Sequence, residues 1–240
     1  MKIVASDERL PSAALDTLQK MGFEVLLLPP DERLPSPLAS HTDMLLFRYG
    51  NAVITHGEYY EKNKAPLDRL NTALGVRIKT CQAKLSNIYP NDAILNALTV
   101  GNRLFIKSDT AAQEILELAK EAGLRIYPVR QGYPACTVLP LSDSAAITAD
   151  RGMARALEGA GVKVTLISDS EIIKLPPYKN GFIGGCAGRY KDTVYFIGNL
   201  DAHPECEIIR EAISEAGLTP VSLLPESDCL FDLGGLLFFD

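Results

Sequence analysis

The sequence predicts an α/β fold made of five strand-strand-helix-strand units that close into a ring. Three observations support this: a glycine-containing phrase that recurs five times, pairs of short apolar runs ahead of the predicted helices, and chain ends that complement each other. Regular recurrence of one supersecondary unit is the signature of a repeat architecture. We therefore expect 240 residues arranged as copies of a single α/β unit.

The recurrent phrase marks the passage from a helix to a strand. In each copy a glycine ends the helical pattern and is followed by alternating apolar and polar residues; these glycines are Gly22, Gly75, Gly123, Gly161 and Gly217. Glycine readily adopts the left-handed conformation that ends many helices, and a period of two is typical of a half-buried strand. The preceding segments carry apolar residues at helical spacing, such as Ile115, Leu116 and Ala119.

Pairs of apolar runs separated by turn residues precede the helices, and this pattern indicates β-hairpins. The expected opening strands are Met44–Phe47, Ala93–Ala97, Thr137–Leu141 and Gly181–Cys186. The expected second strands are Ala52–Thr55, Leu104–Lys107, Ala145–Thr148 and Val194–Ile197. Four complete units follow from these pairs.

The two chain ends predict the fifth unit. Residues 1–30 read as strand, helix and strand without an opening strand, whereas residues 228–240 supply an opening strand without a helix. Pairing the ends closes the ring and leaves no unpaired edge strand. We expect residues 1–240 to form one domain whose fifth unit is shared between the ends.

Composition excludes several classes of protein. The chain is 47% hydrophobic and 22% charged, with a net charge of −6, which is typical of a globular protein and offers no general attraction to nucleic acid. No apolar run is long enough to span a membrane, and the N-terminus does not resemble a signal peptide. We expect a cytoplasmic protein that binds neither nucleic acid nor membranes; the sequence does not indicate its oligomeric state.

Cysteine spacing gives no sign of a disulfide framework or a metal site. The five cysteines are an odd number and include no CxxC pair. The glycine-rich stretch Gly181–Gly188 lacks the G-x-G-x-x-G order of dinucleotide sites, and no Walker sequence is present. We therefore predict no metal and no cofactor.

The unit count and several short stretches resemble the pentein fold, also called the guanidino-group modifying enzyme fold. The stretches are Gln131–Cys136, Ala146–Asp150, Gly181–Gly185, Gly198–Pro204 and Asp232–Gly235. They are similar to an uncharacterised bacterial branch of that superfamily. The resemblance implies a five-bladed α/β propeller around a pseudo-fivefold axis, with opening strands around a central channel and helices outside. It also implies a guanidino substrate in the channel.

The enzymes of that fold use a cysteine shortly after a glycine-rich turn in the last unit, together with a His-x-Asp pattern. Here Gly234-Gly235 is followed by leucines and phenylalanines and not by a thiol. We therefore expect a branch that lacks the usual Cys/His-x-Asp site.

Four residues are the candidates for catalysis. Cys136 and Cys186 are possible nucleophiles, although cysteine is commonly inert core. His203 precedes a helix start and is a candidate proton carrier, with capping as the alternative. Asp232 stands inside an apolar run, where a carboxylate requires a partner, either a substrate cation or a structural one such as Arg48. His41 and His56 receive no role.

Candidate binding residues are Arg48, Asn96, Gln131, Asn199 and Asp201. Aligning the opening strands by hand places Arg48, Asn96, Pro140, Gly185 and Asp232 at equivalent positions. We predict a protein that binds a small polar, guanidino or amino-acid-like molecule in the channel. The sequence leaves open whether it is an enzyme; the enzyme hypothesis is hydrolysis or transfer at an amidino carbon. The alternative is a non-catalytic binding or interaction protein of the same fold.

Overall fold

The computed structural model describes residues 1–240 and contains five three-stranded sheets of one topology. In each sheet the central strand pairs antiparallel with an opening strand and parallel with a third strand. In the order opening, central and third strand, the first two sheets are β3 (Phe47–Tyr49), β4 (Ala52–His56) and β5 (Arg77–Cys81), then β6 (Ala97–Val100), β7 (Arg103–Ile106) and β8 (Arg125–Pro128). The next two are β9 (Val138–Ser142), β10 (Ala145–Thr148) and β11 (Lys163–Leu166), then β13 (Ala187–Tyr190), β14 (Thr193–Phe196) and β15 (Thr219–Ser222). The fifth sheet contains both chain ends and consists of β17 (Leu237–Phe239), β1 (Ile3–Asp7) and β2 (Glu24–Leu28). A parallel pair, β12 (Ile173–Lys174) and β16 (Leu230–Phe231), completes the strands.

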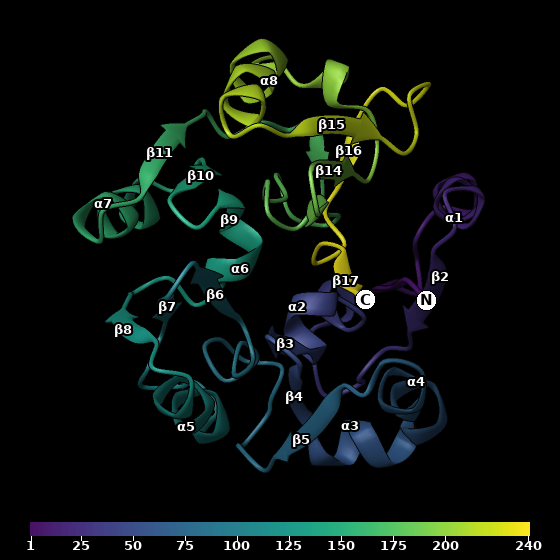
Figure 1. Cartoon of the computed structure of the whole chain (residues 1–240), viewed down its shortest axis with the longest axis vertical. Helices are drawn as coiled ribbons and strands as arrows, with labels where there is room; N and C mark the ends of the chain where they lie inside the picture. Colours follow the sequence, from purple (N-terminus) through teal and green to yellow (C-terminus); the bar gives the residue numbers. More distant parts are fainter.

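Five helices lie on the outside of the arrangement, and the sheets surround a common centre (Figure 1). These helices, each between a central and a third strand, are α1 (Ser12–Lys20), α4 (Lys64–Leu74), α5 (Gln113–Glu121), α7 (Arg151–Gly159) and α8 (Cys206–Glu215). Shorter helical turns are η1 (Ser36–Leu38), α2 (Thr42–Leu45), α3 (Gly57–Lys62), α6 (Pro134–Thr137) and η2 (Leu200–Ala202). No helix of the chain has the length and apolar character needed to cross a bilayer.

The predicted helix-to-strand corners are confirmed. All five predicted glycines have a positive φ, from 68° to 85°, which is the left-handed region where a side chain would be strained. The predicted second strands are confirmed to within a residue at either end.

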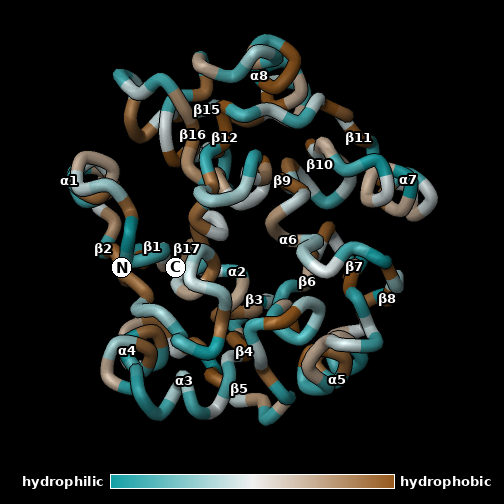
Figure 2. The backbone as a smooth tube through the Cα atoms, turned by 180° about the vertical axis from the view of Figure 1, so that it is seen from behind, coloured by the Kyte–Doolittle hydropathy of each residue, from teal (hydrophilic) through white to brown (hydrophobic).

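The predicted meeting of the two chain ends is also confirmed. β1 pairs antiparallel with β17, with Ile3 opposite Phe239, so that the first and last strands lie in one sheet. Figure 2, which views the molecule from behind, shows the two termini side by side. Val4 and Phe238 enter one apolar cluster, and Ile3 and Phe239 enter another.

The predicted opening strands are placed too early and are corrected. Residues 44–46, 93–96 and 181–186 form turns or short helices, and the opening strands begin only at Phe47, Ala97 and Ala187. The hand alignment is wrong for the same reason, since Arg48 and Pro140 lie in strands whereas Asn96, Gly185 and Asp232 lie in the preceding turns. These turns are apolar because they are buried, and burial alone does not distinguish a turn from a strand.

The five turns ahead of the opening strands contact one another in a closed circle, which we call the floor. Asp43 N donates to Gly234 O, Gly235 N to Gly185 O, and Gly185 N to Cys136 O. Ala135 N donates to Oδ1 of Asn96 at 2.8 Å, and Asn96 Nδ2 lies 3.6 Å from the sulfur of Met44. The circle therefore returns to the first unit. It joins segments of all five units through hydrogen bonds that water does not compete for.

Close packing in the floor makes one glycine substitution a test of its importance. A Cβ at Gly184 would lie 2.3–2.7 Å from the carbonyl oxygens of Ala135, Cys136 and Val138, whereas a Cβ at Gly159 meets nothing within 4 Å. We expect Gly184→Ala to lower the free energy of unfolding by about 1–3 kcal/mol, as overpacking does. The control Gly159→Ala should leave it unchanged or raise it by less than about 1 kcal/mol. Urea denaturation measures the free energy of unfolding of both variants. Equal effects of the two substitutions would contradict the close packing of the floor around Gly184.

Candidate functional site

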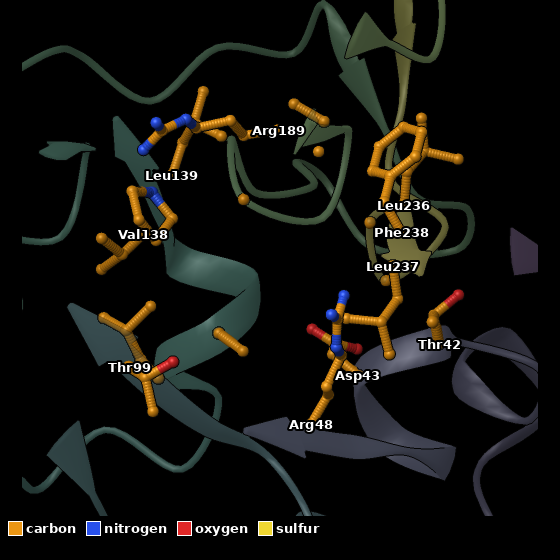
Figure 3. Close-up of a pocket in the computed structure, with 18 of the residues that line it drawn as sticks. Thr42, Asp43, Arg48, Thr99, Val138, Leu139, Arg189, Leu236, Leu237 and Phe238 are labelled. Carbon is orange, nitrogen blue, oxygen red and sulfur yellow. The ribbon is translucent and has the colours of Figure 1, made fainter. Parts of the chain in front are cut away.

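A cavity of about 420 Å³ lies between the opening strands and the floor. Its walls include the apolar side chains of Leu139, Leu236 and Phe238, shown in Figure 3. Its polar lining is confined to a small set: Thr42, Asp43, Arg48, Thr99, Ser142, Asp143 and Arg189. An apolar pocket with a few polar groups is the usual form of a small-molecule site.

Two arginines line the cavity from different sheets. Arg48 comes from β3 and Arg189 from β13, and Figure 3 shows them on opposite sides of the pocket, with Arg48 beside Asp43. In each, Nε donates to the carbonyl oxygen two residues later, Gly50 for Arg48 and Lys191 for Arg189. Neither makes an ion pair within the chain. Their terminal NH₂ groups are therefore available to a ligand.

Asp43 and Cys136 meet where the floor adjoins the cavity. The thiol of Cys136 donates to Oδ2 of Asp43 at 2.5 Å, and Nδ2 of Asn96 donates to the same sulfur at 3.4 Å. Burial raises the pKa of Asp43 to about 7, against the opposing effect of the thiol hydrogen bond. Burial and the neighbouring Asp43 charge raise the pKa of Cys136 well above its usual value. The thiol is thus held in its protonated form.

His41 and Asp232 lie next to this pair. The Nδ1 of His41 is 3.8 Å from Oδ1 of Asp232, and both side chains are wholly buried. Asp232 accepts hydrogen bonds from the backbone N–H groups of Phe182 and Gly234, yet burial raises its pKa to about 6. Burial lowers the pKa of His41 to about 4, so the imidazole is neutral at pH 7. Neither ring nitrogen of His41 has a hydrogen-bond partner.

Glycines make room for Asp232. A Cβ at Gly185 would fall 1.9 Å from Oδ1 of Asp232, and a Cβ at Gly181 would fall 2.5 Å from its Cβ. These two glycines therefore accommodate the carboxylate of Asp232. The structure gives Asp232 backbone donors as partners and not the side chain of Arg48.

The structure brings together three of the candidate residues, Cys136, Asn96 and Asp232, around His41 and Asp43. Cys186 lies in the adjacent turn with its thiol donating to Ile183 O at 3.3 Å, and burial raises its pKa well above the usual value. None of Cys136, Asn96, Asp232 and Cys186 lines the cavity, whereas Arg48 does.

The remaining candidates make local hydrogen bonds away from the cavity lining. Gln131 bonds to Asp150 and to the backbone of Tyr133, and Asn199 caps the short helix η2 through Asp201 N. Asp201 pairs with Arg210 on the surface. Nδ1 of His203 accepts from Glu205 N, and burial lowers the pKa of this histidine.

Sequence reasoning missed His41, Asp43 and Arg189. The expectation of a missing His-x-Asp pattern is corrected, because His41-Thr42-Asp43 is such a pattern; His56 and His203 are likewise followed at two residues by glutamate. The His-x-Asp spacing was the sequence signal that could have identified His41 and Asp43. The signal for Arg189 was the dipeptide Arg-Tyr, which precedes the hairpin turn in both β3 and β13.

Residues 5–237 match a family described as a family of unknown function, DUF6873. Comparison with proteins of curated function finds no match. Solved structures with a similar fold include a dimethylarginine dimethylaminohydrolase (TM-score 0.59, 13% identity, 94% of this chain and 92% of that one). Another is the Pseudomonas aeruginosa dimethylaminohydrolase complexed with citrulline (TM-score 0.57, 14% identity, coverage 94% and 92%). The amidinotransferase SxtG of Microseira wollei has a TM-score of 0.56 at 13% identity, with coverage of 94% and 78%. All are penteins, which confirms the predicted fold class.

Burial of Asp43 predicts a pH dependence of stability. A carboxyl whose folded pKa is raised binds a proton that the unfolded chain has lost, so its contribution to stability falls as pH rises from about 4 to 7. Relative to wild type, Asp43→Asn should therefore gain stability across this window, by up to about 1.4 kcal/mol per pH unit. Urea denaturation in EDTA at stepped pH measures the slope. A difference that does not vary with pH would contradict the raised pKa.

Thiol exposure predicts the pattern of cysteine labelling. Cys81, Cys136, Cys186 and Cys229 are buried, and only Cys206 is partly exposed. We expect a thiol reagent to label one cysteine rapidly in the folded protein at pH 8 and all five after denaturation. Cys206→Ser should remove the fast phase. Rapid labelling of Cys136, identified by peptide mass, would show that its thiol is accessible and activated.

Proposed function

Because the chain belongs to a pentein-fold family of unknown function, we propose that its central cavity binds a small carboxylate-bearing molecule of the amino-acid type. The observation that carries the proposal is the pair of arginines without ion partners, Arg48 and Arg189, which line the cavity from β3 and β13. Thr99 and Ser142 add further polar side chains to the lining.

The chemistry of the two arginines favours an anionic group on the ligand. A guanidinium presents two parallel N–H groups that match a carboxylate, and this recognition is stronger where water is partly excluded. Arg48 is half-buried, and its guanidinium carbon lies 4.7 Å from the centre of the Phe239 ring. Desolvation disfavours its charge and lowers its pKa, so a ligand carboxylate would relieve that cost.

The acidic residues of the lining favour a polar, hydrogen-bonding group on the ligand. They are Asp143 and Asp43, and Asp43 lies beside Arg48 where the lining meets the floor (Figure 3). With a pKa near 7 its carboxyl group is suited either to donate or to accept a proton. Arginine and aspartate side chains in one lining thus fit an amino acid with a nitrogen-containing side chain. This is the ligand class that the pentein resemblance implies.

The site supports binding better than thiol-dependent turnover. Cys136 is buried, its thiol is protonated and it donates to Asp43, whereas a nucleophilic cysteine needs a lowered pKa and access to the substrate. Leu236 and Leu237, which follow the glycine pair, line the cavity without any thiol. We infer a binding protein, with amidino-group hydrolysis or transfer as the alternative if substrate reaches Cys136.

A pair of ligands tests the carboxylate. Arginine and agmatine share the guanidino group, and agmatine lacks the carboxylate. We expect arginine to bind about 10–100-fold more tightly than agmatine in isothermal titration calorimetry, because charge-assisted hydrogen bonds contribute about 1.5–3 kcal/mol. Citrulline keeps the carboxylate but has a neutral side chain, so its affinity separates the contribution of the carboxylate from that of the guanidino group. Equal affinity for arginine and agmatine, or no binding of any of the three, would refute the proposal.

Substitution of the arginines tests their role directly. Arg48→Ala and Arg189→Ala should each weaken arginine binding about 10-fold or more, while agmatine binding should change little. The matched control is Arg125→Ala, which removes an exposed arginine of β8 that does not line the cavity. Loss of affinity in the control to the same extent would show a non-specific effect of charge.

A further inference from the structure

Three side chains of different chemistry converge beneath the cavity. One ligand atom from each of His41, Asp43 and Cys136 lies within 4.8 Å of the other two. They offer an imidazole nitrogen, a carboxylate oxygen and a sulfur. His41 and Asp43 belong to the turn that begins α2, and Cys136 lies in α6, so the group joins two units of the fold.

The hydrogen-bonding capacity of this group is largely unused. His41 is 0% exposed, and neither of its ring nitrogens has a partner. Oδ1 of Asp43 is likewise buried without a partner. An unsatisfied buried polar group costs about 1–3 kcal/mol, and native proteins keep few of them. Three such atoms in one cluster indicate that the cluster interacts with something besides the protein.

We propose that His41, Asp43 and Cys136 form a binding site for one divalent transition-metal ion of the zinc type. Zinc is bound in proteins by imidazole nitrogen, carboxylate oxygen and thiolate sulfur. Three protein ligands leave a fourth position for water or for a donor from a bound molecule. The separation of the ligand atoms is compatible with such a site after small side-chain movements.

Charge balance favours a divalent ion over the protons now present. A thiolate, a carboxylate and a neutral imidazole carry two negative charges, so the ion makes the buried cluster neutral. In the metal-free protein the same cluster stays neutral by holding protons, and metal binding releases them to solvent. Neutrality is what a site so far from water requires.

The neighbours of the three residues are those that metal sites use to orient their ligands. Oδ1 of Asp232 lies 3.8 Å from Nδ1 of His41, so a small movement of the ring would let the carboxylate accept a hydrogen bond from a metal-bound imidazole and orient it. Asn96 Nδ2 donates to the sulfur of Cys136 at 3.4 Å and so stabilises a thiolate. The backbone of His41 is itself fixed, because its carbonyl oxygen accepts from Met44 N and Leu45 N.

The site communicates with the cavity through one residue. Asp43 lines the cavity, whereas His41 and Cys136 do not. The metal would thus enter from the channel and present its open position there. Metal binding does not depend on the ligand proposed above, since it is measured without any organic molecule.

The experiment uses the full chain with Cys206→Ser, which removes the one thiol that is not buried and with it the main adventitious site. Protein stripped with a chelator is dialysed and titrated with Co²⁺ and with Zn²⁺, and the bound metal is counted by atomic emission. We expect one metal per chain, and with Co²⁺ an absorption band from thiolate-to-cobalt charge transfer. Phenol red in weak buffer should report proton release on addition of Zn²⁺.

Substitution of the ligands assigns the site. His41→Ala, Asp43→Asn and Cys136→Ser should each lower the affinity for Zn²⁺ by at least about 100-fold, and Cys136→Ser should abolish the charge-transfer band. Asp232→Asn should weaken binding by about 10–100-fold and keep the band, as expected of a residue that positions His41. The matched control is Cys186→Ser, which alters an equally buried thiol outside the group. It should change neither the affinity for Zn²⁺ nor the charge-transfer band.

Several results would overturn the proposal. They are less than one metal per two chains at saturation, a charge-transfer band that survives Cys136→Ser, and equal loss of binding in Cys186→Ser. Because a variant that fails to fold would also lose metal, each is first shown to have a cooperative urea transition in EDTA. If His41→Ala or Cys136→Ser is unfolded, the loss of metal binding in Asp43→Asn decides whether the cluster is the site, because this substitution keeps the size of the side chain. Failure of arginine to bind while Zn²⁺ binds would refute the proposed function and leave the metal site intact.

Discussion

The closed circle of hydrogen bonds in the floor is the constraint on which the rest of the structure depends. Four of the five contacts between successive turns involve a backbone group, as in the bond from Gly185 N to Cys136 O, and the fifth joins the side chains of Asn96 and Met44. The pair Asp43 and Cys136 also joins the first unit to the third. The circle holds the opening strands around the cavity and also seals one end of it. Sealing excludes water, and exclusion of water is what raises the pKa of Asp43 and Asp232 and lowers that of His41. The same circle of hydrogen bonds therefore determines both the placement of the opening strands and the shifted pKa values of the buried side chains.

Local signals in the sequence were sufficient for the corners and the central strands. Gly75 and Gly161 adopt the left-handed conformation, and glycine does so with less steric strain than any other residue type. The opening strands were misplaced because Met44 and Ile94 are apolar for a tertiary reason, which is burial in the floor. For the site, the three residues were found singly and for different reasons: Asp232 as a carboxylate in an apolar run, Cys136 as a possible nucleophile, and Asn96 from the alignment of the opening strands. Their assembly was not foreseeable, since Asp43 and Cys136 are 93 residues apart and only the closed floor brings them into contact.

The fold is shared with guanidino-modifying enzymes. At 10–14% identity a common fold leaves the functional side chains free to differ. In this chain leucines occupy the positions after the last glycine pair, and the thiol in the floor comes from a different unit. The polar groups of this chain lie both in the wall of the cavity, at Arg48 and Arg189, and in the layer beneath it, around His41.

The pairing of β1 with β17 joins strands that are far apart in the sequence. Val4 and Ala5 are synthesised long before Leu237 and acquire their antiparallel neighbour only after it emerges from the ribosome. Until then β1 is an apolar strand with a free edge, which is a template for aggregation. Gly234, which completes the floor, also follows the other four turns in the sequence. A chain interrupted before this segment would therefore leave β1 with an unpaired edge and the floor with a gap beside Asp43.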